Sequence, residues 1–107
     1  MLEAKARRLT GAADSAKPPA GRNIYGWHVA EGRADIFLTY RTNAIEARQQ
    51  NPDQRIVMLP NDIAVGADYG LTVIVGAPPA AQRFAQFALS GQGRGILAHH
   101  GLAPPAP

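Results

Sequence analysis

The sequence is most strand-like in the stretch Val65-Gly66-Ala67-Asp68-Tyr69-Gly70-Leu71-Thr72-Val73-Ile74-Val75. Its odd-numbered residues are apolar or aromatic and would share one side of a strand. The glycines on the other side predict that a neighbouring backbone or a ligand lies close by. Two shorter apolar stretches, residues 34–40 and 55–60, precede it and are also predicted to be strands.

Helical patterns alternate with these stretches. They are predicted over residues 1–9, 23–31, 43–50, 78–89 and 90–100. Asn23 and Ser90 are suited to cap the second and last helices, and Asn43 with Glu46 resembles a capping box. Phe84 and Phe87 are predicted to face inward. Helices interleaved with short strands predict an α/β or α+β layer fold.

Composition excludes several functional classes. The chain has 107 residues, which suits one compact domain. It has no cysteine, which excludes disulfide frameworks, thiolate zinc sites and cysteine nucleophiles. No apolar run approaches the ~18 residues that cross a bilayer. The net charge of +3 permits an anionic partner without requiring one.

A candidate anion site lies where Pro18-Pro19-Ala20-Gly21 leads through Arg22 and Asn23 into a predicted helix. Free backbone N–H groups and the positive end of the helix dipole attract anions at such a place. Tyr40, at the end of the next predicted strand, adds a hydroxyl donor. From their spacing alone, these residues favour the alternative of a stiff loop with an aromatic side chain at its rim.

The sequence gives little support for a metal site, an enzyme or a nucleic-acid interface. The adjacent pair His99-His100 cannot chelate one ion from a helix without further ligands, so no metal site is predicted. Neither serine lies in a nucleophile elbow, and no carboxylate pair is placed at a reacting centre, so we expect no enzyme. The basic N-terminal residues lack interleaved aromatics, which argues against a nucleic-acid partner.

Several segments together resemble the C-terminal half of periplasmic molybdate-binding proteins. They are Gly21–Asn23, Val29–Ile36, Tyr40–Ala44, Val65–Val73, Arg83–Ser90 and Gly95–Pro104. The segment from Glu31 to Asn43 is the more specific part, whereas the last two segments are common to many type II substrate-binding proteins. The resemblance covers about residues 2–104.

The resemblance implies part of a two-lobed receptor of an ABC transporter, with the three-layer α/β/α fold of type II periplasmic binding proteins. Such receptors clamp a tetrahedral dianion with neutral donors, which suits a dry cleft. Tyr40 matches the family's binding tyrosine, and the helix start at Arg22 and Asn23 matches a backbone N–H contact. The implied ligand is molybdate or tungstate, with no cofactor, and the implied location is the periplasm.

Relatives of this kind are longer and begin with a signal peptide, which is not evident here. The resemblance therefore implies a fragment: residues 1–64 would be the remainder of the second lobe, and residues 65–107 a crossover strand and helices returning to the first. We expect such a fragment to bind molybdate weakly or not at all. The alternative hypothesis is an orphan α/β fragment that acts as a self-associating or protein-interaction domain, with a possible homo-oligomer.

Overall fold

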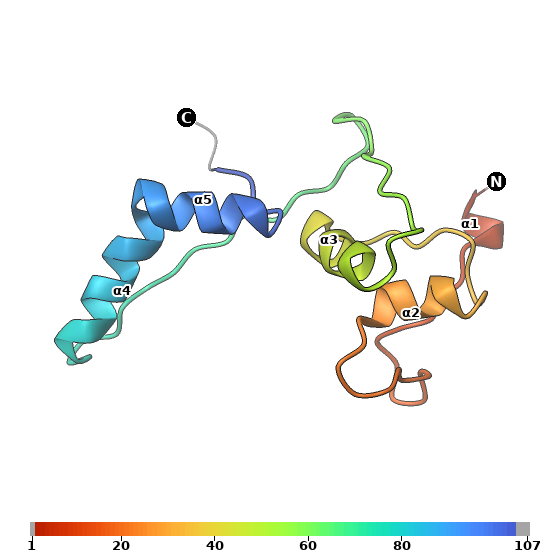
Figure 1. The fold of residues 1–107 in the computed structure, drawn as a ribbon, viewed down its shortest axis with the longest axis horizontal. Coiled ribbons are helices and arrows are strands. Elements are labelled where there is room, and N and C mark those ends of the chain that lie inside the picture. Colours follow the sequence, from red (N-terminus) through yellow and green to blue (C-terminus); the bar gives the residue numbers. More distant parts are fainter. Residues whose placement is uncertain (1, 105–107) are drawn as a thin grey trace.

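The computed structural model describes residues 2–104, which contain five helices. These are α1 (Leu2–Lys5), α2 (Ile24–Ala30), α3 (Arg41–Gln50), α4 (Pro79–Leu89) and α5 (Gly91–His99). Figure 1 shows α1 to α3 at one end of the molecule and α4 and α5, which meet at a corner, at the other, joined by a long connection without helix. The radius of gyration is 17.3 Å, whereas a compact domain of this length has about 13 Å.

Local interactions explain where most helices begin. The Asn23 side chain accepts hydrogen bonds from Tyr25 N and Gly26 N, so it caps α2 as predicted. The Ser90 hydroxyl accepts from Gly93 N at 3.1 Å and caps α5, also as predicted. Pro79 occupies the first turn of α4, where its missing N–H costs nothing.

One predicted helix end and one predicted helix start are wrong. The helix expected over residues 1–9 is limited to Leu2–Lys5, and Met1 lies outside the described residues. The capping box at Asn43 does not form, because α3 already begins at Arg41 with Tyr40 as its N-cap. Asn43 instead donates to the Thr39 hydroxyl at 3.1 Å.

The predicted α/β class, with a partial three-layer α/β/α fold of the type II kind, is also wrong. Residues 2–104 are helical or irregular and contain no β-strand. The stretches 34–40, 55–60 and 65–75 lack the paired backbone that defines a strand, and their side chains are largely exposed: Ile36 is 82% and Val65 87% exposed. An apolar alternating pattern predicts an extended backbone, but a strand forms only where a second one supplies its hydrogen bonds.

The buried core is small. Trp27, Ala47 and Ala85 are its buried apolar side chains, and Asn23 and His28 are buried polar ones. Four of these five lie where α2 packs against α3. The inward orientation predicted for the phenylalanines of α4 is wrong, since Phe84 is 69% and Phe87 43% exposed. In α4 it is Ala85 that is buried.

The two ends of the molecule touch at Gly101. A Cβ placed on this residue would lie 2.8 Å from Ile45 Cδ1 and 3.2 Å from the Thr42 backbone. The backbone that follows α5 therefore lies against the first turn of α3. Gly101 also has a φ of 95°, which lets it end α5 with little strain.

Candidate functional site

Asn23 is the centre of the junction between α2 and α3. Its side-chain oxygen caps α2 through Tyr25 N at 3.1 Å and Gly26 N at 3.0 Å. Its side-chain nitrogen donates to Glu46 Oε2 at 3.1 Å, and its backbone N–H donates to Gln50 Oε1 at 2.7 Å. Its carbonyl accepts from Trp27 N at 2.9 Å, so all of its polar groups are engaged with α2 and α3. Asn23 is 8% exposed, so these bonds are partly shielded from water.

Three further hydrogen bonds tie the same junction together. Gln50 Nε2 donates to Gly21 O at 3.0 Å, and Gln54 Nε2 donates to Gly26 O at 2.8 Å. The Arg22 guanidinium donates to Asn51 Oδ1 at 3.2 Å. The backbone N–H of Arg22 donates to Pro19 O. The predicted anion-binding loop is therefore held by neutral amide groups from the end of α3 and the residues after it.

Tyr40 lies at the opposite end of α3. It is the N-cap residue of that helix and is 50% exposed. Glu46 and Gln50, which hold Asn23, are six and ten residues further along the chain, or about 9 and 15 Å along the helix axis. The structure thus brings Arg22 and Asn23 together but leaves Tyr40 apart from them.

The start of α3 carries uncommitted donors. The first hydrogen bond at this end runs from Ala44 N to Tyr40 O, and no side chain caps the helix. The N–H groups of Arg41, Thr42 and Asn43 precede it and have no acceptor among the described residues. Together with the dipole of a ten-residue helix, they form a locally positive surface beside the Tyr40 side chain.

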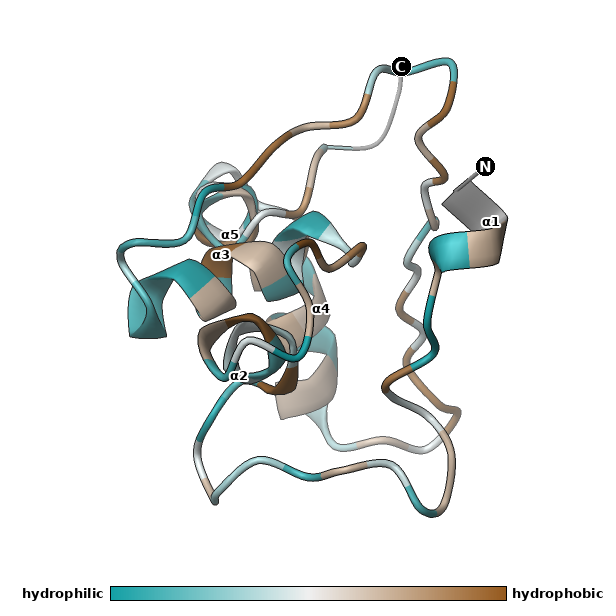
Figure 2. Ribbon diagram, turned by 90° about the vertical axis from the view of Figure 1, so that its right-hand side faces the viewer, coloured by the Kyte–Doolittle hydropathy of each residue, from teal (hydrophilic) through white to brown (hydrophobic). Residues whose placement is uncertain are grey.

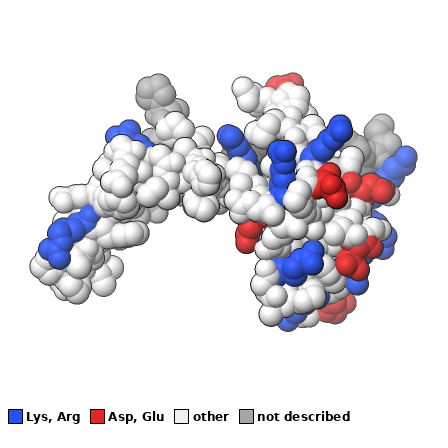
Figure 3. All heavy atoms as spheres, in the orientation of Figure 1, with Lys and Arg blue, Asp and Glu red and all other residues white. Residues whose placement is uncertain are grey.

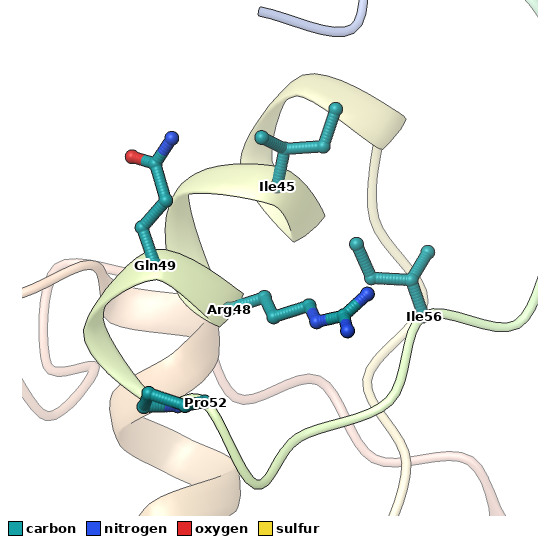
Figure 4. Close-up of a pocket in the computed structure, with 5 residues that line it drawn as sticks. All are labelled: Ile45, Arg48, Gln49, Pro52 and Ile56. Atoms are coloured by element: carbon teal, nitrogen blue, oxygen red, sulfur yellow. The ribbon is translucent and has the colours of Figure 1, made fainter.

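Two shallow depressions lie along α3. The first is lined by Ile45, Arg48, Gln49, Pro52 and Ile56, and Figure 4 shows the Arg48 side chain reaching from α3 toward Ile56. The second shares two of these residues and extends along the helix to His100; its lining is Thr42, Asn43, Ile45, Glu46, Gln49 and His100. Arg22, Asn23 and Tyr40 line neither of them.

His28 is the most deeply buried side chain of the α2–α3 region, with 1% of its surface exposed. Its ring stacks on Phe37 at a centroid distance of 5.8 Å and lies 4.9 Å from the Trp27 ring. Neither ring nitrogen has a hydrogen-bond partner among the described residues. Burial, and secondarily the positive charge of Arg33, lower the pKa of His28 below its ordinary value of 6.5.

This burial predicts acid sensitivity. Above about pH 6.5 the imidazole is neutral in both states, so it adds no pH dependence. Below that pH the unfolded chain takes up a proton and the folded chain does not. The free energy of unfolding should then fall by up to about 1.4 kcal/mol per pH unit until the lowered pKa is reached. Urea unfolding followed by Trp27 fluorescence at a series of pH values measures this slope.

The matched variants are His28→Phe, which keeps an aromatic ring against Phe37, and His99→Gln, which removes an exposed imidazole from α5. His28→Phe should flatten the slope between about pH 6.5 and pH 5, where carboxylates contribute little. His99→Gln should leave it unchanged. An unchanged slope in His28→Phe would show that another group causes the acid sensitivity.

The described residues contain no group of three or more His, Cys, Asp or Glu side chains placed to hold a metal ion. His99 and His100 lie with their rings edge to face, at a centroid distance of 5.5 Å. Within residues 2–104, no helix has the length and hydrophobicity of a membrane span.

Sequence reasoning missed the two glutamines of the junction and the burial of His28. A signal for His28 was present, because it shares a helix face with Trp27. No local signal marks Gln50 or Gln54, since a polar residue at the end of a polar helix is ordinarily solvated. Their partners lie more than twenty residues away in the sequence.

Comparison with known proteins gives one family. A family model described as bacterial extracellular solute-binding protein matches residues 2–103, nearly the whole chain. No curated protein and no solved structure matches the sequence.

Proposed function

The chain belongs to the family of bacterial extracellular solute-binding proteins, and we propose that its solute is a tetrahedral oxyanion such as molybdate or tungstate. Membership in this family makes it a receptor and not an enzyme, with a transporter as the partner that receives the solute. We extend the proposal to location and partner: the receptor acts in the periplasm, and it delivers the solute to the membrane subunit of an ABC transporter. The resemblance of residues 31–43 to molybdate-binding proteins supports it.

The observation that carries the choice of ligand is the start of α3. Three backbone N–H groups without acceptors adjoin the half-exposed Tyr40, and Arg41 adds a positive charge. Backbone N–H groups donate and cannot accept, so they favour an oxyanion that carries no proton. Molybdate and tungstate are such dianions at neutral pH, whereas phosphate is partly protonated.

Arg22 and Asn23 do not belong to the donors at the start of α3. The backbone N–H groups at the start of α2 are engaged, except for that of Ile24, which has no acceptor among the described residues. The Arg22 side chain holds Asn51 through one nitrogen and retains other donors. Because Arg22 binds Asn51 at the end of α3 opposite Tyr40, we expect both Arg22 and Asn23 to keep that end of α2 in position and not to contact an oxyanion at the start of α3.

The affinity should be low, because few donors are free. Each hydrogen bond to a charged ligand contributes about 1.5–3 kcal/mol. The cost of association offsets much of the sum over the three N–H groups and the Tyr40 hydroxyl, so we expect a Kd of about 1 mM. Isothermal titration with molybdate should give weak saturable binding, which tungstate displaces more effectively than phosphate. The absence of saturation at tens of millimolar molybdate would contradict the proposal.

The Tyr40→Phe variant tests the hydroxyl directly. Loss of one charge-assisted hydrogen bond should weaken molybdate binding about tenfold. Tyr69→Phe is the matched control, since Tyr69 is 71% exposed and lies outside the site. It should bind molybdate as the unmodified chain does. Equal affinities in the two variants would remove Tyr40 from the site.

A further inference from the structure

The molecule exposes more surface than a compact monomer of its mass, and many large apolar side chains lie on that surface. Its accessible surface is 9193 Å², whereas a compact monomer of this mass has about 5,800 Å². The excess of about 3,400 Å² is several times the ~800 Å² that each partner buries in a stable complex. Seventeen large apolar side chains contribute to it, from Ile36 to Leu97. The surface is therefore large enough for an obligate interface.

The stretch 65–74 is the part of this surface best suited to a specific contact. Its backbone runs extended through the connection between the two ends of the molecule, where Figure 2 shows hydrophobic residues along an open loop. No backbone N–H or carbonyl from Val65 to Val73 is hydrogen-bonded to another described residue. Such a row of free groups next to alternating apolar side chains pairs readily with another extended chain.

The sequence of this stretch is self-complementary in the antiparallel sense. With a two-fold axis at Gly70, Tyr69 lies opposite Leu71 of the second copy, and Asp68 lies opposite Thr72. A parallel, in-register pair would instead place Asp68 beside the same aspartate of the other copy, and like charges in that position are destabilising. The antiparallel arrangement avoids this repulsion.

Charge distribution favours the same arrangement. Asp62 and Asp68 are the charged residues between positions 56 and 82, and Arg83 and Arg94 are those of α4 and α5 apart from the histidines. Figure 3 shows basic side chains and no acidic ones on the α4–α5 end. In an antiparallel dimer the basic α4–α5 end of one copy lies on the side of the residues that precede position 65 in the other copy, which include Asp62. Opposite charges on facing sides favour this arrangement.

We propose that this chain forms a homodimer by antiparallel pairing of residues 66–74 about a two-fold axis at Gly70. The dimer supplies the hydrogen bonds that the extended backbone lacks and covers its apolar side chains. This inference concerns a surface other than the oxyanion site, so either can fail without the other.

Single cysteines test the register, because the chain has none of its own. In Gly70→Cys the two copies place the new thiols directly opposite each other, with Cα atoms about 5 Å apart, which suits a disulfide. In the control Gly66→Cys the two positions are eight residues out of register, or about 27 Å apart. Mild oxidation should therefore give covalent dimers from Gly70→Cys and almost none from Gly66→Cys. Equal cross-linking of both would overturn the proposed pairing.

Sedimentation velocity tests the dimer itself. The unmodified chain should sediment as a dimer at micromolar concentration, and Leu71→Pro should raise the dissociation constant at least a hundredfold by removing a paired N–H. Val57→Pro, at a residue 82% exposed in another extended stretch, is the control and should stay dimeric. Circular dichroism should show the helices unchanged in both, since neither residue lies in a helix. A monomeric unmodified chain, including one that binds only a different protein, would overturn the proposal.

Discussion

Replacing Gly26 by alanine is expected to separate α2 from α3 and to lower the free energy of unfolding of this pair by about 1–3 kcal/mol. A Cβ at this position would lie 2.7 Å from Asn51 Nδ2, 2.9 Å from Ala47 Cβ and 3.1 Å from Ala47 Cα. The Asn51 amide is itself bonded to Ala47 O at 2.9 Å, so it cannot simply turn away. The helices would have to move apart.

The expected loss is large compared with the total free energy of unfolding of the α2–α3 pair. The buried side chains of the pair are few, and a unit this small without disulfides or metals is marginally stable. Unfolding should therefore be visible as loss of helix by circular dichroism. A red shift of Trp27 fluorescence should accompany it, since Trp27 is the single tryptophan and is 8% exposed.

Gly95→Ala in α5 is the matched control. A Cβ there has nothing within 4 Å, so alanine should stabilise the helix by up to about 1 kcal/mol through its higher propensity. The same substitution thus has opposite signs at the two positions. A stabilising effect at Gly26 would show that α2 and α3 do not pack as described.

Replacing Asn23 by alanine is the second large effect that we expect. The variant loses the cap of α2 and the bond to Glu46, at a combined cost of about 2 kcal/mol. The backbone bond from residue 23 to Gln50 is retained, because it does not involve the side chain. Urea unfolding monitored by Trp27 fluorescence gives the difference in free energy of unfolding between the variant and the unmodified chain.

Asn23→Ser separates the two contributions. Serine retains an oxygen that can cap α2 but cannot reach Glu46, so its stability should lie between those of the unmodified chain and Asn23→Ala. If serine and alanine are equally destabilising, the cap contributes nothing measurable. Because Asn23 holds the junction, loss of molybdate binding in Asn23→Ala would reflect misfolding as much as a lost contact. Tyr40→Phe is the sharper test of the site.

The junction and the start of α3 have different physical roles in the proposed receptor. The junction commits its donors internally, through Asn23, Gln50 and Gln54, and so provides rigidity. The start of α3 leaves donors uncommitted and so remains available to a ligand. Rigid support next to free donors is what a binding site for an oxyanion requires.

Four of the five helices in residues 2–104 were largely predictable from the sequence. Asn23, Pro79 and Ser90 act on backbone groups within a few residues of themselves, so their effect can be read from the local sequence. The position of Tyr40 as the N-cap of α3 was not predicted, because the sequence placed the start of that helix at Asn43. The separation of Tyr40 from Asn23 could not be predicted, because it depends on which end of α3 meets α2.

The sequence by itself determined where α2 to α5 lie, to within two residues at each end. Only the tertiary structure decided that residues 65–75 remain unpaired, that Phe84 is exposed and that Gln50 holds Asn23. The physical reason is the distance along the chain over which each kind of interaction acts. Helix caps and propensities act between residues close in the chain, whereas strand pairing and burial depend on segments far apart in sequence, which a periodic pattern does not specify.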